Sequence, residues 1–239
     1  MPIIDFHSHV LPGMDDGSRS VEISLEMLRR SAEQGVEVMA ATSHFYAWRD
    51  RPEHFLERRT SAWERLSAAL EPGMPRICLG AEVAFFEGIS EALQVDRLCL
   101  GETNVLLLEM PFRPWSGRDV DEVEALMSRR GFQVVLAHLE RYLPMRENRS
   151  LIRELLELPV LVQINAESLL EWRGRGKVLK LFREGKAHLL GSDCHGLEYR
   201  PPNLGQGRAF LNKKLGPNAL MRIDEAGAGL LREESIANV

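Results

Sequence analysis

The sequence predicts an α/β fold in which parallel strands alternate with helices. Short apolar runs recur along the 239 residues, and segments with helical period separate several of them. The runs are continuously apolar, which is typical of strands that are covered on both faces of a sheet. About seven such units favour a closed or nearly closed (β/α) barrel, with a doubly wound open sheet as the main alternative.

Each unit can be located in the chain. The predicted strands are Ile3–Phe6, Val36–Ala41, Arg76–Gly80, Val105–Leu108, Val134–Ala137, Val160–Ile164 and His188–Leu190. In the first predicted helix, Ser20 suits the N-cap and Gly35 suits the end. The apolar face of that helix consists of Val21, Leu25, Leu28 and Ala32. The tail after about Gly205 also has a helical pattern.

The composition is that of an ordinary globular protein, with 44% hydrophobic residues, 27% charged residues and a net charge of −5. This charge predicts no nucleic-acid or anionic-membrane partner. No apolar run approaches the roughly 20 residues of a membrane span, and no secretory leader precedes Asp5. Three scattered cysteines argue against a disulfide framework. We therefore expect one cytoplasmic domain, residues 1–239, and the oligomeric state stays open.

Side chains that can bind metals follow the predicted strands. Because the carboxyl ends of parallel strands meet at one edge, these side chains should gather there. They are His7, His9, Asp15, Asp16, His44, Glu82, Glu109, His138, Asp193 and His195, with the milder Asn165 after the sixth strand. A single histidine is often only a hydrogen-bonded structural residue. Five of the seven histidines at one rim, beside carboxylates, instead favour a metal centre.

The ligand types indicate which metals and which chemistry to expect. His7 and His9 are two residues apart, so on an extended segment both rings can reach one ion. Imidazoles with carboxylates suit Mn, Fe or Zn, and the lack of cysteine ligands disfavours a structural zinc site. The ligands exceed what one ion uses, which implies two or three ions with a bridging carboxylate. Such clusters activate water and clamp phosphoryl oxygens, so we expect a phosphoester hydrolase.

Several short motifs carry a resemblance to a known family. They are Ile4–His9, Leu11–Gly17, Ala41–His44, Gly80–Glu82, Leu107–Glu109, Ala137–Tyr142, Gln163–Ala166, Gly191–His195 and Arg200–Pro202. In this order and spacing, the chain from residue 4 to 202 resembles the polymerase-and-histidinol-phosphatase (PHP) superfamily. More narrowly, it is similar to the manganese-dependent protein-tyrosine phosphatases of bacterial capsule and exopolysaccharide gene clusters.

The resemblance implies a distorted (β/α)7 barrel that holds three divalent ions, Mn first and Fe or Zn as alternatives. The implied ligand sets are His7, His9, Glu82 and Asp193; Asp16, His44 and His195; and Glu82, Glu109 and His138, with Glu82 bridging. Asp15 is an alternative to Asp16. Arg141 and Arg200 resemble the family's phosphate-binding arginines, and a guanidinium can hold two phosphate oxygens at once.

The implied activity is hydrolysis of phosphotyrosine in proteins, and the implied partner is a bacterial tyrosine kinase of polysaccharide export. A histidinol phosphatase is the main alternative. An amidohydrolase also begins with His-x-His, but it usually has a bridging lysine where this chain has Glu82 and Glu109. A non-catalytic, metal-binding regulatory domain is an alternative from a different class of protein.

Two further segments allow more than one interpretation. Cys194–Arg200 fits the C-x5-R pattern of cysteine-based tyrosine phosphatases. However, Glu198 is a poor occupant of a phosphate loop, and a thiolate beside Asp193 would have a raised pKa. The aromatic and arginine-rich segment Phe45–His54 follows His44 directly. It either flanks the substrate entrance or packs on itself as a surface loop.

Overall fold

The computed structural model describes residues 1–231; residues 232–239, the end of the predicted domain, lie outside this part. The strands are β1 (Ile4–Ser8), β2 (Val38–Ala41), β3 (His44–Phe45), β4 (Arg76–Leu79), β5 (Glu82–Ala84), β6 (Val105–Glu109), β7 (Gln133–Leu136), β8 (Leu161–Asn165) and β9 (Leu189–Gly191). The α-helices are α1 (Val21–Glu33), α2 (Pro52–Ser67), α3 (Gly117–Ser128), α4 (Arg149–Leu155), α5 (Glu167–Leu170), α6 (Arg175–Arg183), α7 (Leu204–Leu215) and α8 (Pro217–Leu230). Short 3-10 helices are η1 (Val95–Leu98), η2 (Leu139–Tyr142) and η3 (Arg146–Asn148).

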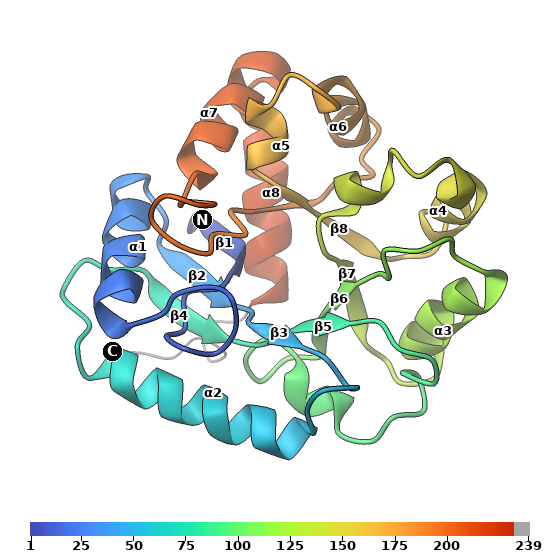
Figure 1. Cartoon of the computed structure of the whole chain (residues 1–239). Helices are drawn as coiled ribbons and strands as arrows, with labels where there is room; N and C mark the ends of the chain where they lie inside the picture. Colours follow the sequence, from blue (N-terminus) through green and yellow to red (C-terminus); the bar gives the residue numbers. More distant parts are fainter. Residues whose placement is uncertain (232–239) are drawn as a thin grey trace.

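The strands form a curled parallel sheet with helices around its outside (Figure 1). One part has the order β1-β2-β4 and the other the order β3-β5-β6-β7-β8-β9. The chain passes from the first part of the sheet to the second between β2 and β3, and again between β4 and β5. On the opposite side, Ser8 forms a parallel bridge with Cys194, just beyond β9. The strand order follows the chain without the reversal of a doubly wound sheet.

The seven predicted strands all overlap observed ones, which confirms the parallel α/β prediction. The two short strands β3 and β5 were not predicted. Ser20 caps α1 as predicted, accepting a hydrogen bond from the Ile23 N–H, and Gly35 follows the helix with φ +84°. The predicted apolar face was only partly right, since α1 buries Ser24 and Ser31 beside Leu28. Their hydroxyls donate to backbone carbonyls, so these buried polar groups are hydrogen-bonded.

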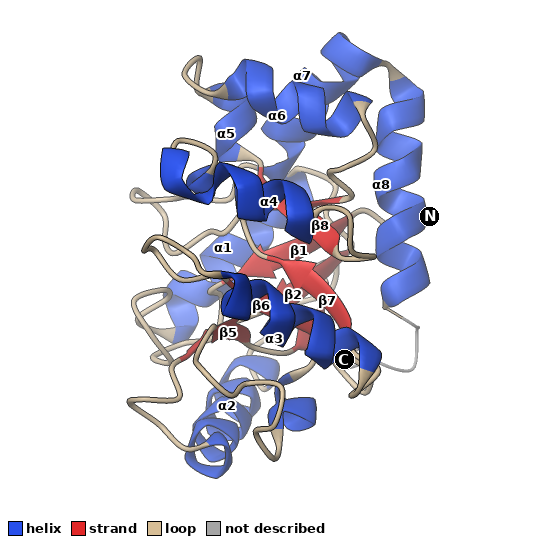
Figure 2. Cartoon of the chain, turned by 90° about the vertical axis from the view of Figure 1, so that its right-hand side faces the viewer, coloured by secondary structure: helices blue, strands red, loops and turns tan. Residues whose placement is uncertain are grey.

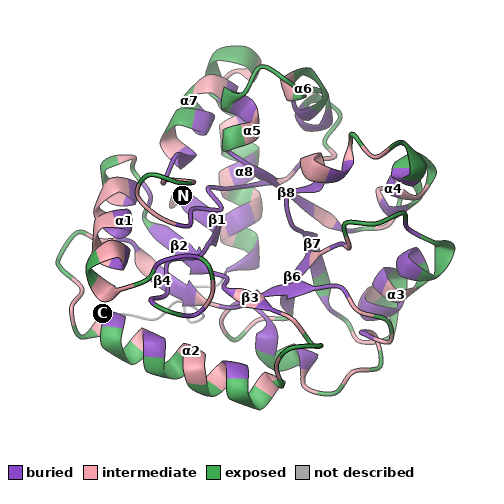
Figure 3. Cartoon of the chain, viewed as in Figure 1, coloured by how far each residue is buried: buried purple, intermediate pink, exposed green. Residues whose placement is uncertain are grey.

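Most residues of the strands are buried (Figure 3), and buried apolar side chains form two clusters. The outer layer lies between strands and helices and includes Met39, Leu106 and Ile164. The inner cluster consists of Ile4, Phe6, Val38, Ala40, Cys78, Leu100, Val105, Leu107, Val135, Ala137, Leu189, Leu230 and Leu231. Leu230 and Leu231 come from the end of α8, which lies on the same side as the chain's N-terminus (Figure 2). The inner space is therefore packed, and polar groups are left to the carboxyl edge.

A bulge in β1 redirects the chain just before that edge. Ile4 pairs with Val38 and Asp5 with Met39, but Ser8 pairs with Ala41, so β1 contains one extra residue. Bulges re-aim side chains and are frequent beside functional sites. Phe6 packs in the inner cluster, and His7 is the next residue along the chain. The extra residue allows the side chains of His7 and His9 to point to the same centre. Among residues 1–231, no helix combines the length and apolarity needed to cross a membrane.

Candidate metal centre

The predicted ligands converge around the carboxylate of Glu82, which is buried at the start of β5. Its Oε2 lies 3.3 Å from His7 Nε2, 3.4 Å from His9 Nε2 and 2.8 Å from His44 Nδ1. Its Oε1 lies 2.7 Å from His138 Nε2. Histidines from the carboxyl ends of β1 and β7 and from β3 thus meet at one carboxylate, as expected if the strand ends share one edge.

The donor atoms form overlapping groups, each with all atoms within 4.8 Å of one another. The groups are His9, Asp16, His44 and His195; His7, His9 and Glu82; His7, His138 and Asp193; and His44, Glu82 and Glu109. Together they contain all nine residues expected to bind metal. The second predicted set gains His9. The third is spatially compatible, because His138 Nε2 also lies 3.5 Å from Glu109 Oε1.

The geometry at His7 and His9 fits a cation. His7 Nδ1 lies 3.1 Å from the amide oxygen of Gln163, and His9 Nδ1 lies 2.7 Å from Asp15 Oδ2. Both partners are acceptors, so in the neutral rings both Nδ1 atoms carry the proton and both Nε2 atoms present lone pairs. These Nε2 atoms are only 3.2 Å apart. Two facing lone pairs repel unless a proton or a metal ion lies between them, so the pair is suited to metal binding.

The two adjacent aspartates have different surroundings. Asp15 is nearly buried and accepts hydrogen bonds from His9 Nδ1 and from the His44 backbone N–H. Asp16 is exposed, and its Oδ1 lies 3.6 Å from both His44 Nε2 and His195 Nε2. Asp16 therefore has its carboxylate among the donor atoms of a possible metal site, whereas Asp15 is hydrogen-bonded to His9 and to the backbone of His44.

Burial and charge control protonation in this cluster. Burial favours the neutral form of Glu82, but His7 and His138 hold its pKa well below the usual range. Burial lowers the pKa of His138 to about 3 and so keeps it neutral. Burial, reinforced by the charge of Glu82, raises the pKa of Glu109 to about 7. Burial also opposes a proton on His9, yet Asp15 and Glu82 raise its pKa to about 10. A proton on His9 therefore takes the place that a cation would occupy.

Asn165 was expected at this edge only as a milder polar group and Gln163 was not expected there, yet both position the cluster from β8. The Gln163 oxygen also accepts from the backbone N–H of His138, and its Nε2 donates to Asn165 Oδ1 at 2.9 Å. Asn165 Nδ2 donates to Asp193 Oδ2 at 2.7 Å. One signal was available in the sequence, because a glutamine two residues before Asn165 interrupts an otherwise apolar strand and shares its face.

Arg141 and Arg200 both reach the centre through Asp193. Each donates from Nη2 to Asp193 Oδ2, Arg141 at 2.8 Å, while Asp193 Oδ1 faces the Nε2 atoms of His7 and His9. Burial, then the nearby charge of Arg141, lowers the pKa of Arg200 to about 10, so it stays charged at neutral pH. The guanidiniums are thus fixed at the edge of the cluster, with further N–H donors available.

Left-handed backbone conformations accompany these groups. Among residues 1–231, four non-glycine residues have positive φ, and three of them are His138 (+33°), Asp193 (+53°) and Arg200 (+48°). Such conformations are unfavourable for residues with a Cβ and tend to collect at functional sites. Here they turn the chain sharply after β7 and β9 and direct the side chains inward.

The C-x5-R alternative does not fit the structure. Cys194 is fully buried, and burial, followed by the charge of Asp5, raises the pKa of its thiol to about 12. The thiol is therefore neither accessible nor ionised, and Arg200 contacts Asp193 and His195 instead. Cys194 is a small residue packed between two candidate ligands.

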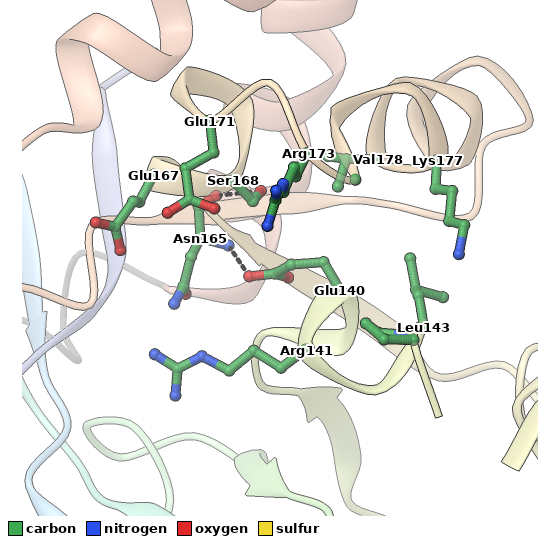
Figure 4. A pocket seen from close by; sticks show the side chains of 12 residues that line it. Glu140, Arg141, Leu143, Asn165, Glu167, Ser168, Glu171, Arg173, Lys177 and Val178 are labelled. Carbon is green, nitrogen blue, oxygen red and sulfur yellow. Dashed lines mark hydrogen bonds between the residues drawn. The ribbon is translucent and has the colours of Figure 1, made fainter. Parts of the chain in front are cut away.

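Cavities open beside the centre. One, of about 540 Å³, is lined by Asp16, His44, Tyr46, Arg49 and neighbours, so the Phe45–His54 segment does border the cluster. Its aromatic rings also pack on each other, since the centre of the Tyr46 ring lies 5.2 Å from that of His44 and 5.0 Å from that of Trp48. Another, of about 400 Å³, extends from Arg141 and Asn165 toward α6. Figure 4 shows Arg141 beside Asn165, whose backbone N–H donates to Glu140.

This fold and site place the protein in the class of α/β proteins that carry a cluster of potential metal ligands at the carboxyl edge of a curled parallel sheet. The chain belongs to the CpsB/CapC family of capsular polysaccharide synthesis, whose model matches residues 3–229.

Relatives agree in length and fold. The chain is 28% identical to the tyrosine-protein phosphatase YwqE of Bacillus subtilis, covering 98% of this chain and 93% of the relative. It is 28% identical to the tyrosine-protein phosphatase CpsB of Streptococcus pneumoniae, covering 90% and 91%. A crystal structure from work on these two metal-dependent tyrosine phosphatases superposes with a TM-score of 0.83, 28% identity and coverage of 98% and 96%. L-hydantoinase from Arthrobacter aurescens, at 12% identity and a TM-score of 0.57, shares the fold.

Proposed function

We propose that this protein is a metal-dependent phosphatase that hydrolyses phosphotyrosine in proteins. The observation that carries the proposal is the position of Asp193, which bonds two guanidiniums through Oδ2 and faces the histidine cluster through Oδ1. Groups that suit a phosphate and groups that suit divalent cations are therefore adjacent. Membership of the CpsB/CapC family and the tyrosine-protein phosphatases among its relatives support phosphotyrosine as the substrate class.

We assign nine ligands to three divalent ions. His7, His9, Glu82 and Asp193 would hold the first, Asp16, His44 and His195 the second, and Glu82, Glu109 and His138 the third; these contacts are supported by the groups described above. We favour Mn, with Fe or Zn as alternatives, because imidazole and carboxylate ligands suit these ions. When bound, the ions would activate a water near neutral pH and offset charge on the phosphoryl oxygens.

The chain's own residues have separate tasks in this proposal. Arg141 and Arg200 bind the phosphoryl oxygens and stabilise the charge that builds up on them. Asp15 and Gln163 fix the tautomers of His9 and His7, so that each ring offers Nε2 to the centre. Phenolate is a good leaving group, so no dedicated acid is required for its departure.

The wider setting is also part of the proposal. The family description supports a role in capsular polysaccharide synthesis, and we propose a bacterial tyrosine kinase of polysaccharide export as the partner. The protein would act in the cytoplasm as one domain. If β2 with β3 and β4 with β5 are each one interrupted strand, the curled sheet is a distorted (β/α)7 barrel.

A side-by-side assay tests the function. Phosphotyrosine peptide, phosphoserine peptide and histidinol phosphate are supplied with Mn, with and without chelator. The enzymes are wild type, His138→Ala, Cys194→Ser and, as a control, His54→Ala, whose histidine lies outside the ligand groups. We expect chelator and His138→Ala to abolish turnover of phosphotyrosine, while Cys194→Ser and His54→Ala retain most of it.

Each alternative predicts a different result. Chelator-resistant activity that is lost in Cys194→Ser would overturn the metal mechanism. Preference for histidinol phosphate would favour a histidinol phosphatase. No phosphate release from any substrate in the presence of Mn would favour a regulatory, metal-binding domain.

A further inference from the structure

One exposed aromatic ring stands beside the metal centre without a function assigned above. Phe112 lies in the loop between β6 and α3 and is 58% exposed. Its ring is stacked on that of Tyr142 at 4.8 Å and lies nearly parallel to that of His138 at 6.4 Å. His138 in turn contacts Glu82 at the middle of the cluster. The Phe112 ring is thus a direct neighbour of His138, a candidate metal ligand.

Single exposed apolar residues are common on protein surfaces, so exposure alone has little meaning. What distinguishes Phe112 is the rigidity of its loop. The Tyr142 hydroxyl donates to the Met110 carbonyl, and Trp115 Nε1 donates to the Pro111 carbonyl at 2.9 Å. The loop therefore has hydrogen bonds immediately before Phe112, on two consecutive residues.

The loop is fixed equally well after Phe112. Asn148 Nδ2 donates to the Arg113 carbonyl at 3.1 Å, and Asn148 Oδ1 accepts from the Trp115 N–H at 2.8 Å. Arg113 also pairs with both oxygens of Asp119 at 2.8 Å. An exposed ring on a fixed loop loses little conformational entropy when a ligand covers it, which is the arrangement of a recognition element.

The other aromatic group near the cluster is less available. Tyr46 contacts the rings of His44 and Trp48, and the Arg49 guanidinium lies 5.0 Å from its ring centre. The Tyr46 ring therefore already contacts three neighbouring side chains, which leaves less of it for a substrate ring. Phe112 keeps more than half of its surface exposed, and its ring lies beside that of His138.

We infer that Phe112 is the specificity-determining residue that stacks on the aromatic ring of the substrate and selects aryl over alkyl phosphates. The inference rests on the proposed phosphatase function and specifies how its substrate class is chosen. Paired rings in proteins lie 4.5–7 Å apart, and the Phe112 ring lies 6.4 Å from that of His138, so a phenyl group attached to a phosphoryl group beside His138 would be close enough to stack on Phe112. A serine phosphate has no ring and gains nothing from this contact.

Equilibrium binding tests the inference without relying on turnover. Calorimetry on the Mn-loaded full chain measures the Kd of phenylphosphonate and of methylphosphonate, which share the charged group and differ in the ring. We expect wild type to bind phenylphosphonate about tenfold more tightly, and Phe112→Ala to reduce this preference to about twofold or less. Phe112→Tyr should keep the preference. Trp172→Ala is the matched control, because Trp172 is an exposed aromatic outside the ring contacts of the cluster, and it should bind like wild type.

The inference is overturned if Phe112→Ala keeps the preference for the phenyl group or weakens both ligands equally. If Phe112→Ala does not fold, judged by circular dichroism, Phe112→Leu keeps the apolar bulk without the ring and should still lose most of the preference. Ratios of kcat/KM for phosphotyrosine and phosphoserine peptides should change in parallel. A wild type that prefers phenylphosphonate through Phe112 but releases no phosphate would refute the proposed function and leave the ring contact standing.

Discussion

The carboxylate of Asp15 accepts a hydrogen bond from His9 Nδ1 at 2.7 Å and so turns His9 Nε2 toward the centre. The same Oδ2 accepts the backbone N–H of His44 at 2.8 Å. The next residue, Asp16, instead extends its own Oδ1 toward His44 and His195. Two consecutive acids of the same type thus have different contacts, and we propose that Asp15 orients His9 while Asp16 is a direct ligand.

Replacing Asp15 and replacing Asp16 should therefore weaken metal binding in different ways. Asp15→Asn places an amide against His9 Nδ1, disturbs the tautomer and should weaken metal binding about 10–100-fold, as for other groups that orient ligands. Asp16→Asn should remove mainly one ion and leave the others bound. Elemental analysis after gel filtration and metal titrations measure both effects. Full metal content in Asp15→Asn at limiting metal concentration would contradict the orienting role.

Metal binding should release protons and strengthen as pH rises. The pKa of His9 is about 10 in the metal-free protein because Asp15 and Glu82 outweigh burial. Below that pH the ring is protonated, and a metal ion has to displace the proton. The apparent affinity for the metal should thus fall about tenfold for each unit by which the pH is lowered, per proton released. His138, with a pKa lowered to about 3 by burial, is already neutral at pH 7 and releases none.

Calorimetry in two buffers with different ionisation enthalpies counts these protons. At pH 7.5 we expect about one proton from His9 in wild type and fewer in Asp15→Asn, which lacks the charge that raises the pKa. An apparent metal affinity that does not change between pH 6.5 and 8.5 would show that metal binding does not displace a proton from His9.

The two arginines should affect turnover much more than metal content. Arg141→Ala or Arg200→Ala removes a donor at the phosphoryl oxygens, and we expect kcat/KM to fall about 100–1000-fold. The lysine variants should also lose at least about tenfold, because a lysine cannot bind two oxygens in one plane. Arg153→Ala, an exposed arginine on α4, is the control. Loss of metal in proportion to activity would instead assign the arginines a purely structural role through Asp193.

The sequence was sufficient to predict the strands and the residue types of the centre for a clear physical reason. Strands that are buried on both faces are continuous apolar runs, and their carboxyl ends must meet at one edge. His44, Glu82 and His138 could therefore be brought together without coordinates. The short strands β3 and β5 escaped prediction because each begins at one of these polar residues rather than within an apolar run.

Features that depend on single backbone torsions could not be predicted. The extra residue in β1 is visible only when Ser8 is paired with Ala41. The left-handed conformations of His138, Asp193 and Arg200 contradict the intrinsic preference of these residues and exist because the surrounding contacts impose them. The different surroundings of Asp15 and Asp16 also depend on the path of the loop after β1, which the residue types do not indicate. Likewise, Gln163 acts only because β8 places its amide beside His7 and His138.

Close packing behind His7 leads to a final prediction, at Gly191 on β9. A Cβ atom at this position would lie 2.6 Å from His7 Cβ and 2.8 Å from Gln163 Nε2, closer than real contacts allow. Gly191→Ala should therefore displace His7 or its Gln163 partner, lower the free energy of unfolding by about 1–3 kcal/mol and weaken metal binding. Gly176→Ala is the matched control, since nothing lies within 4 Å of its Cβ position on α6. That variant should be neutral or more stable by up to about 1 kcal/mol. Denaturant unfolding with and without Mn measures both quantities, and a Gly191→Ala protein that matches wild type in stability and in its gain on adding Mn would show that His7 tolerates the displacement.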